Sequence, residues 1–131
     1  MTPPHWRPQR GEVVLVSFPF LDTAGVPQAK PRPAVVISGR LIHDTTADIL
    51  IAAMSSRPNS DPLPTDYQIL YGTSEAQSAG VKVTSWVKAS NLAAVPKAAV
   101  TRRLGRLASE SMRQVERRLR LALELQNDAR I

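Results

Sequence analysis

The chain has 131 residues, of which 43% are hydrophobic, and this length and composition fit one globular domain with its own core. Seventeen Lys and Arg residues against eleven Asp and Glu give a net charge of +6, and there is no cysteine, which excludes disulfides, thiol nucleophiles and cysteine-based metal sites. The longest uninterrupted apolar run, Ile49–Met54, is far too short for a membrane span. Because residues 1–10 also lack the apolar stretch of a signal peptide, we expect a soluble, cytoplasmic protein.

The positive charge is concentrated at the two ends of the chain. Residues 1–40 carry five basic and two acidic side chains, and residues 101–131 carry eight arginines against four carboxylates. The middle of the chain is slightly acidic. A fold that brings the ends together presents a positive stripe, which favours a polyanionic partner such as nucleic acid. The alternative is a charge that only keeps a small protein soluble.

The first half of the chain predicts an arm, a strand and a long loop. Residues 1–10 hold three prolines and no periodic pattern, so we expect a flexible arm before a single domain that spans residues 11–131. Glu12–Phe18 is β-branched and apolar on both faces, which predicts a strand covered on both sides. Pro19 is expected to end it, and the thirteen residues Pro19–Pro31 are expected to form a loop.

Further strands are predicted where short apolar or alternating runs occur. These are Ala34–Ser38, Asp48–Ser55, Thr65–Leu70, Val81–Trp86 and Arg103–Leu107. The small residues of Gly72–Gly80 predict a loop, and Pro96 is expected to interrupt the chain between the last two strands.

The C-terminal segment predicts an amphipathic helix of about four turns. Ser109 is a candidate N-cap, since its hydroxyl can accept from the free amides of a first turn. Apolar residues then recur at three- and four-residue spacing, at Met112, Val115, Leu119 and Leu123. Together with the strands, this predicts a mainly β protein with α elements, built as a small barrel with one terminal helix.

Lys30-Pro31-Arg32-Pro33 is an unusual local feature at the start of a predicted strand. Each proline fixes its own φ, and Pro33 also holds Arg32 in extended geometry. A guanidinium that is restricted in this way suits bidentate phosphate binding. The alternative is a proline-bounded turn with a solvated arginine.

A second polar group, Ser55-Ser56-Arg57, follows the apolar strand Asp48–Ser55. Hydroxyls at a strand end often only cap a turn. The same position also aims a hydroxyl and a guanidinium at a ligand from a rigid support.

Other kinds of site find no support in the sequence. The two histidines, His5 and His43, are far apart and no carboxylate pattern accompanies them, so we expect no metal. There is no Gly-x-Ser-x-Gly elbow, Walker loop or Gly-x-Gly-x-x-Gly, so we expect no nucleotide cofactor and no hydrolase triad.

Taken in order, several segments resemble the MazF/PemK family of toxin endoribonucleases. They are Gly11–Val16, Lys30–Ser38, Ile51–Ser56, Ser85–Ser90 and Leu104–Leu107, followed by the terminal helix. The resemblance covers nearly the whole of Gly11–Leu125. The resemblance rests on the ordered series at this spacing rather than on any single motif.

The resemblance implies an SH3-like barrel that works as a homodimer, is neutralised by a cognate antitoxin, and cleaves single-stranded RNA without a metal. Attack by the ribose 2′-OH leaves a 2′,3′-cyclic phosphate and a 5′-OH. The arginine of the family's Arg-Pro motif corresponds to Arg32, and its Thr or Ser at the end of the third strand corresponds to Ser55. Arg32 and the Ser55 hydroxyl would stabilise charge on the phosphate.

Further RNA contacts are expected from both sides of these two residues. Trp86 offers a ring on which a base can stack, although a lone strand Trp is more often core, and Lys88 lies two residues on. Phe20 and Lys30 belong to the expected loop and would grip substrate there. Arg113, Arg117 and Arg120 on the terminal helix are expected to form only a solvated face.

This chain departs from many relatives at Ser55, where threonine is common, and at Trp86, where a Gln often precedes the Val-Lys pair. Base preference is therefore open. Two alternatives from other classes also remain: a nucleic-acid-binding barrel without activity, and a toxin of this fold that acts on a protein target such as gyrase.

Overall fold

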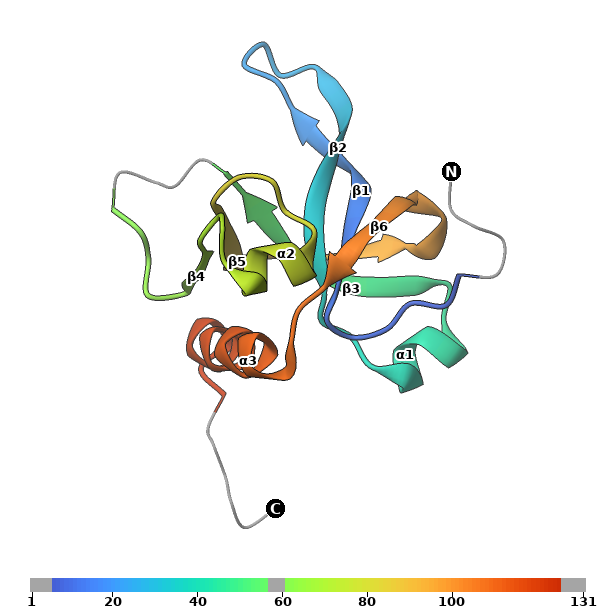
Figure 1. The fold of residues 1–131 in the computed structure, drawn as a ribbon. Helices are drawn as coiled ribbons and strands as arrows, with labels where there is room; N and C mark the ends of the chain where they lie inside the picture. Colours follow the sequence, from blue (N-terminus) through green and yellow to red (C-terminus); the bar gives the residue numbers. More distant parts are fainter. Residues whose placement is uncertain (1–5, 57–60, 126–131) are drawn as a thin grey trace.

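A computed structural model gives the fold and describes residues 6–56 and 61–125, without the side chains of residues 18–20. One six-stranded antiparallel sheet has the order β4-β5-β3-β2-β1-β6 (Figure 1). Its strands are β1 (Glu12–Leu21), β2 (Pro27–Val36), β3 (Asp48–Ser55), β4 (Asp66–Ile69), β5 (Ser85–Pro96) and β6 (Val100–Arg106). The helices are α1 (Arg40–Thr45), α2 (Ser74–Ala79) and α3 (Ser109–Leu123), with a 3-10 turn at Lys97–Ala99. The mainly β class with a terminal helix is confirmed, whereas closure into an SH3-like barrel stays a prediction.

Apolar side chains are buried on both faces of the sheet, as the sequence of β1 predicts. Val13 faces one core, and Val14 and Val16 face the other. The first core lies under α2 and α3 and contains Val13, Val35, Ala52, Met54, Ile69, Ala76, Ala79, Val87, Leu107, Met112 and Val115. The second contains Val14, Val16, Ala34, Val36, Ile49, Ile51, Val95 and Val100, with Trp6 packed against it. Each fully buried Val or Ile contributes about 1.5–3 kcal/mol, so the two cores fix the sheet between them.

The prediction of a loop at Pro19–Pro31 is wrong, because these residues belong to a hairpin that projects from the sheet (Figure 1). β1 continues to Leu21 and β2 begins at Pro27, so the connection is only five residues long. The carboxylate of Asp22 accepts from the backbone amides of Ala24 and Val26 at 2.9 and 2.8 Å. Gly25 has a φ of 78°, which a turn of this kind requires and which a side chain would disfavour.

The hairpin tolerates four prolines because their nitrogens point away from the partner strand. They are Pro19, Pro27, Pro31 and Pro33. The amide of Asp22 donates to the carbonyl of Val26 at 3.1 Å, so even-numbered residues form the hydrogen-bonded pairs of this ladder. The prolines are all odd-numbered. The outer ladders have also ended before them, because pairing with β6 stops at Val16 and pairing with β3 stops at Ala34.

The prediction of a loop at Gly72–Gly80 is also wrong, since Ser74–Ala79 form α2. The hydroxyl of Thr73 accepts from the amide of Ala76, and Gly80 ends the helix with a φ of 74°. The helix packs closely on β6: a Cβ placed on Gly105 would lie 2.4 Å from the carbonyl oxygen of Ser78. Glycine at this position therefore fixes the distance between α2 and β6.

Three smaller expectations need correction. The strand expected at Val81–Trp86 begins only at Ser85 and runs on to Pro96, which ends it. Helix α1 was not predicted; its buried His43 shares a 2.6 Å hydrogen bond with Ser38, whose hydroxyl accepts from the amide of Leu50 in β3 at 2.9 Å. Ser109 is not the N-cap of α3: Ala108 is, and no side chain caps the helix.

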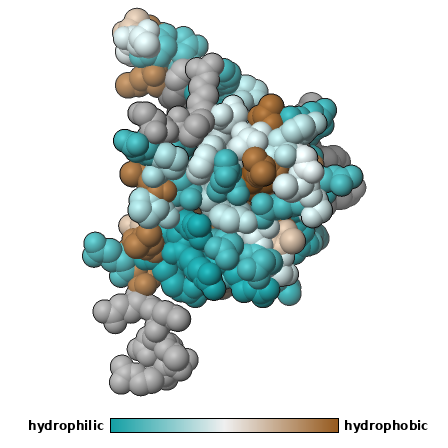
Figure 2. All heavy atoms as spheres, turned by 60° about the vertical axis from the view of Figure 1, so that its left-hand side comes forward, coloured by the Kyte–Doolittle hydropathy of each residue, from teal (hydrophilic) through white to brown (hydrophobic). Residues whose placement is uncertain are grey.

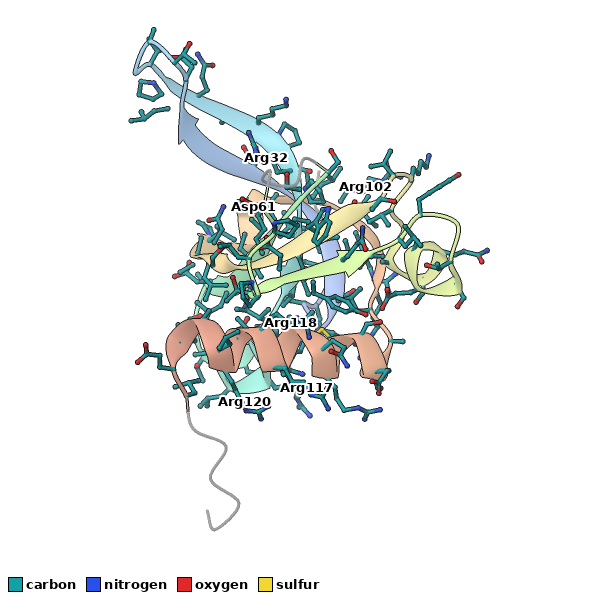
Figure 3. The ribbon with its side chains drawn as sticks, turned by 90° about the vertical axis from the view of Figure 1, so that its left-hand side faces the viewer. Arg32, Asp61, Arg102, Arg117, Arg118 and Arg120 are labelled. Atoms are coloured by element: carbon teal, nitrogen blue, oxygen red, sulfur yellow. The ribbon has the colours of Figure 1, made fainter. Side chains whose placement is uncertain are left out.

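A polar network joins α3 to β4 and α2. The hydroxyls of Tyr67 and Ser111 both donate to the carboxylate of Glu75. The guanidinium of Arg118 lies 5.2 Å from the centre of the Tyr67 ring, on the side of α3 that faces the sheet (Figure 3). Burial, followed by the hydrogen bond to Glu75, raises the pKa of Tyr67. The tyrosine therefore stays a hydrogen-bond donor at neutral pH.

Candidate functional site

The register of the sheet brings the candidate site residues onto one face, which we call the site face. Residues directly opposite each other in an antiparallel ladder point to the same side. One cross-strand row contains Val14, Ala34, Ala53, Lys88 and Asp66. The next row, nearer the hairpin, contains Val16 paired with Arg32, and Ser55 paired with Trp86, which also pairs with Gln68. In the first row, Val14 and Ala34 belong to the second core. In the next row, Val16 still belongs to that core, whereas Arg32 and Gln68 are exposed to solvent.

Arg32 and Ser55 lie in the same part of this face. The pairing of β2 with β3 ends at Ala34↔Ala53, and Arg32 and Ser55 each follow two residues beyond this pair, on the same face of their strands. Arg32 is exposed at the base of the hairpin (Figure 3), and Ser55 is half-buried at the last position of β3. A guanidinium and a hydroxyl are thus both placed on the site face, each two residues beyond the last pair that β2 and β3 form.

The two serines at the end of β3 differ in their surroundings. Met54 points into the first core, so its neighbour Ser55 points to the site face. Ser56 follows the strand, carries no ladder partner in the described pairing, and is exposed. Arg57, the third residue of this predicted group, lies outside the described residues.

The hairpin carries the two contacts expected from the long segment. Lys30 pairs with Phe18 and is exposed two residues from Arg32, so it is on the site face of β2. Phe20 pairs with Gln28 in the backbone ladder, and its side chain lies outside the described residues. A strand rather than a loop therefore positions both residues.

Lys88 faces a buried carboxylate. Its Nζ lies 4.0 Å from Oδ2 of Asp66, with 14% of the Lys88 side chain and 1% of the Asp66 side chain exposed. Trp86, two residues away on β5, is half-buried.

Sequence reasoning missed Asp66 and Gln68. Gln68 is exposed beside Trp86, and its amide can both donate to and accept from a nucleobase edge. The strand alternation in Thr65–Leu70 shows that these two residues share a face, but only the pairing of β4 with β5 shows which face it is.

Three exposed arginines lie on α3, which packs against the first core, on the other face of the sheet. Arg113, Arg117 and Arg120 are exposed on α3, and Arg117 and Arg120 point away from the sheet (Figure 3), which confirms the predicted solvated face. Figure 2 shows one side of the molecule as mostly hydrophilic, with apolar side chains in small separate groups.

Metal-ligand clusters and membrane-spanning helices are both absent from the described parts of the chain. Within residues 6–56 and 61–125, no three His, Asp or Glu side chains are grouped so that they could hold a metal ion. In the same ranges, no helix has the length and apolar character that crossing a membrane requires.

Comparison with known proteins identifies the family. The sequence model of the PemK-like, MazF-like toxins of type II toxin-antitoxin systems matches residues 9–123. The chain therefore belongs to this toxin family, as its sequence predicted. Comparison with curated proteins gives no match.

Solved structures share the fold over nearly the whole chain. An endoribonuclease from a mycobacterial species, in complex with its cognate antitoxin, has a TM-score of 0.67 at 21% identity and covers 92% of this chain and 99% of its own. The MazE–MazF complex from Deinococcus radiodurans has a TM-score of 0.66 at 20% identity, with 92% and 99% covered. The toxin MazF-mt6 of Mycobacterium tuberculosis has a TM-score of 0.68 at 14% identity, with 88% and 98% covered.

Proposed function

We propose that this toxin is an endoribonuclease that cleaves single-stranded RNA at specific sequences without a metal ion. The ribose 2′-OH attacks the adjacent phosphate, and the products carry a 2′,3′-cyclic phosphate and a 5′-OH. The observation that carries the proposal is the placement of Arg32, Ser55, Trp86 and Lys88 on one face of the sheet. Two cations, a hydroxyl and an aromatic ring on a rigid support match the needs of a phosphodiester and its bases.

Arg32 and Ser55 act on the phosphate. In-line attack builds negative charge on the non-bridging oxygens, and fixed donors aimed at those oxygens lower the barrier. The guanidinium of Arg32 supplies charge and paired N–H donors, and the hydroxyl of Ser55 supplies a directed donor from the end of β3. A guanidinium carries N–H donors and no acceptor, so the part of Arg32 is charge stabilisation rather than general base catalysis, and overall the proton of the 2′-OH ends on the leaving 5′-oxygen.

The surrounding residues bind the RNA strand. Lys30 on the hairpin and Lys88 on β5 lie on either side of Arg32 and Ser55 and contact flanking phosphates. Trp86 stacks on a base, and Phe20, Ser56 and Arg57 complete the binding surface. Gln68, next to Trp86, adds an amide that reads a base edge.

A cognate antitoxin and a second copy of the chain are the proposed protein partners. Two of the similar structures are toxins solved with their antitoxins, which supports the antitoxin as a partner.

A symmetric dimer covers the same patch on both subunits and would bury apolar side chains that the single chain exposes, such as Leu121 at 55%. Light scattering at micromolar concentration should give twice the 14.3 kDa chain mass. A constant monomer mass across a dilution series would contradict the dimer.

The test is cleavage of a long single-stranded RNA in excess EDTA, with the Arg32→Ala variant as the matched control. We expect discrete fragments whose 5′ ends accept a phosphate from polynucleotide kinase directly, and whose 3′ ends are cyclic phosphates by mass spectrometry. Absence of fragments with and without Mg²⁺ would favour a non-catalytic barrel or a protein target. Cleavage only with Mg²⁺, or 5′-phosphate ends, would refute the mechanism.

A further inference from the structure

The buried carboxylate of Asp66 is part of the site face, although no substrate can touch it. Only 1% of its side chain is exposed, and it lies in β4 directly opposite Lys88. Its Oδ2 accepts from the amide of Leu63 at 3.0 Å, and its own amide donates to the carbonyl of Leu63 at 2.9 Å. These bonds clamp the carboxylate at the start of β4.

The turn at Leu63 does not explain why a charged residue stands here. One neutral oxygen acceptor is enough for the Leu63 amide, and an asparagine supplies it. A buried carboxylate is costly unless a positive charge or further donors compensate it. Among the described residues, Oδ1 of Asp66 has no hydrogen-bond partner, and the compensating cation is Lys88.

The ammonium of Lys88 is too far from the carboxylate of Asp66 to donate to it, so its N–H donors can bind another ligand. At 4.0 Å, Nζ and Oδ2 attract each other through charge but are too far apart for a hydrogen bond. Asp66 therefore fixes the place of the ammonium without taking one of its three N–H donors. Phosphate oxygens are the acceptors that such an ammonium suits.

Lys88 is also close to the proposed cleavage position. Ser55 pairs with Trp86, so Lys88 is the diagonal neighbour of Ser55, and such neighbours lie about 7–8 Å apart on the same face. Among the described residues of β3 and β2, the side chains on this face between Lys88 and Arg32 are small: Ala53, Ser55 and Ala34. The ammonium thus has room to reach toward the row that holds Arg32 and Ser55.

We propose that Asp66 is a positioning residue for RNA cleavage: it holds the ammonium of Lys88 beside Ser55, so that Lys88 meets the scissile or the adjacent phosphate with its donors in place. This inference rests on the proposed endoribonuclease function. Asp66 acts only through Lys88, and its removal lets the lysine side chain adopt positions from which it no longer meets the phosphate.

A double-mutant cycle tests the dependence of Asp66 on Lys88. Single-turnover cleavage of an RNA oligonucleotide is measured for the wild type, Asp66→Asn, Lys88→Gln and the double variant, at temperatures below the lowest unfolding transition. We expect Lys88→Gln to slow cleavage about 10-fold or more and Asp66→Asn about 5-fold or more, as for the loss or misplacement of a charged donor. In the Lys88→Gln background, Asp66→Asn should change the rate less than about 2-fold.

The controls separate positioning from a purely structural role. Asp44→Asn removes an exposed carboxylate that lies 3.9 Å from Arg40 in α1, and should leave both backgrounds unchanged. Asp66→Glu keeps the charge and should retain more activity than Asp66→Asn. If the asparagine variant shows no cooperative unfolding, Asp66→Ser, which also keeps an oxygen acceptor, takes its place in the cycle.

Two results would overturn the inference alone: an equal loss from Asp66→Asn in both backgrounds, or no loss in the presence of Lys88, each with a wild type that cleaves. A wild-type protein that cleaves no RNA overturns the proposed function and this inference together.

Discussion

The two serines at the end of β3 allow a test of the proposed active site within one dipeptide. Ser55 is half-buried on the site face opposite Trp86, whereas Ser56 is exposed beyond the strand. Removing either hydroxyl deletes one oxygen atom, so the substitutions are chemically matched. Only the variant that lacks the hydroxyl on the site face should lose cleavage.

The magnitude follows from the kind of donor that is lost. A fixed donor to a developing oxyanion contributes about 2.7–4 kcal/mol, and each 1.36 kcal/mol is a factor of about ten, so its removal costs about 100- to 1,000-fold. Ser55→Ala should therefore slow single-turnover cleavage by about 100-fold, and Ser56→Ala by no more than a few-fold. Arg32 is exposed, and water weakens the electrostatic interactions of an exposed group. The loss of cleavage rate in Arg32→Ala should therefore be at the lower end of this range, about 100-fold. Arg32→Lys should restore little, because an ammonium lacks the planar pair of donors.

The assay is cleavage of a labelled RNA oligonucleotide with excess enzyme, and circular dichroism shows whether each variant is folded. Similar, mild losses at Ser55 and Ser56 would refute the assignment of Ser55. A folded Arg32→Ala protein that cleaves at the wild-type rate would refute the whole catalytic interpretation.

Three further outcomes are expected. RNA binding, measured by fluorescence anisotropy against salt concentration, should have a log–log slope near −3, because about four phosphate contacts each contribute about −0.7; a slope near zero would show that the basic surface does not bind RNA. Gly105→Ala should lower the free energy of unfolding by about 1–3 kcal/mol in denaturant titrations, because its Cβ would meet the Ser78 carbonyl at 2.4 Å, whereas Gly39→Ala, where a Cβ meets nothing within 4 Å, should have a much smaller effect. The raised pKa of Tyr67, caused by burial and by Glu75, means that the folded state holds the phenol proton more tightly than the unfolded state. Stability should therefore be full below about pH 10 and fall as the pH rises through the folded-state pKa, and Tyr67→Phe should flatten this part of a pH series of unfolding curves.

Local patterns in the sequence were enough to predict several elements and the main candidates for the site. Asp48–Ser55 has the predicted bounds of β3, and the apolar spacing from Met112 predicted α3. The fixed φ angles of the prolines around Arg32 predicted an extended arginine. Such signals depend on neighbouring residues, so the sequence carries them without the rest of the fold.

Pairing between distant segments decided the remainder. The prolines of Pro19–Pro31 suggested a loop, and only the register of β1 with β2 shows that all their nitrogens point outward. The sequence of α2 contains the cap at Thr73 and the glycine at Gly80, but so short a helix is stable only because its buried alanines pack on the sheet.

The composition of the site face is likewise a property of the tertiary structure. Strand alternation divides each strand into two faces, but a shift of one residue in the pairing exchanges them. The sequence therefore singled out Arg32 and Ser55 separately, without showing that they share a face of the sheet. The partnership of Asp66 with Lys88 was invisible, because it joins residues of two strands that only the ladder between β4 and β5 brings side by side.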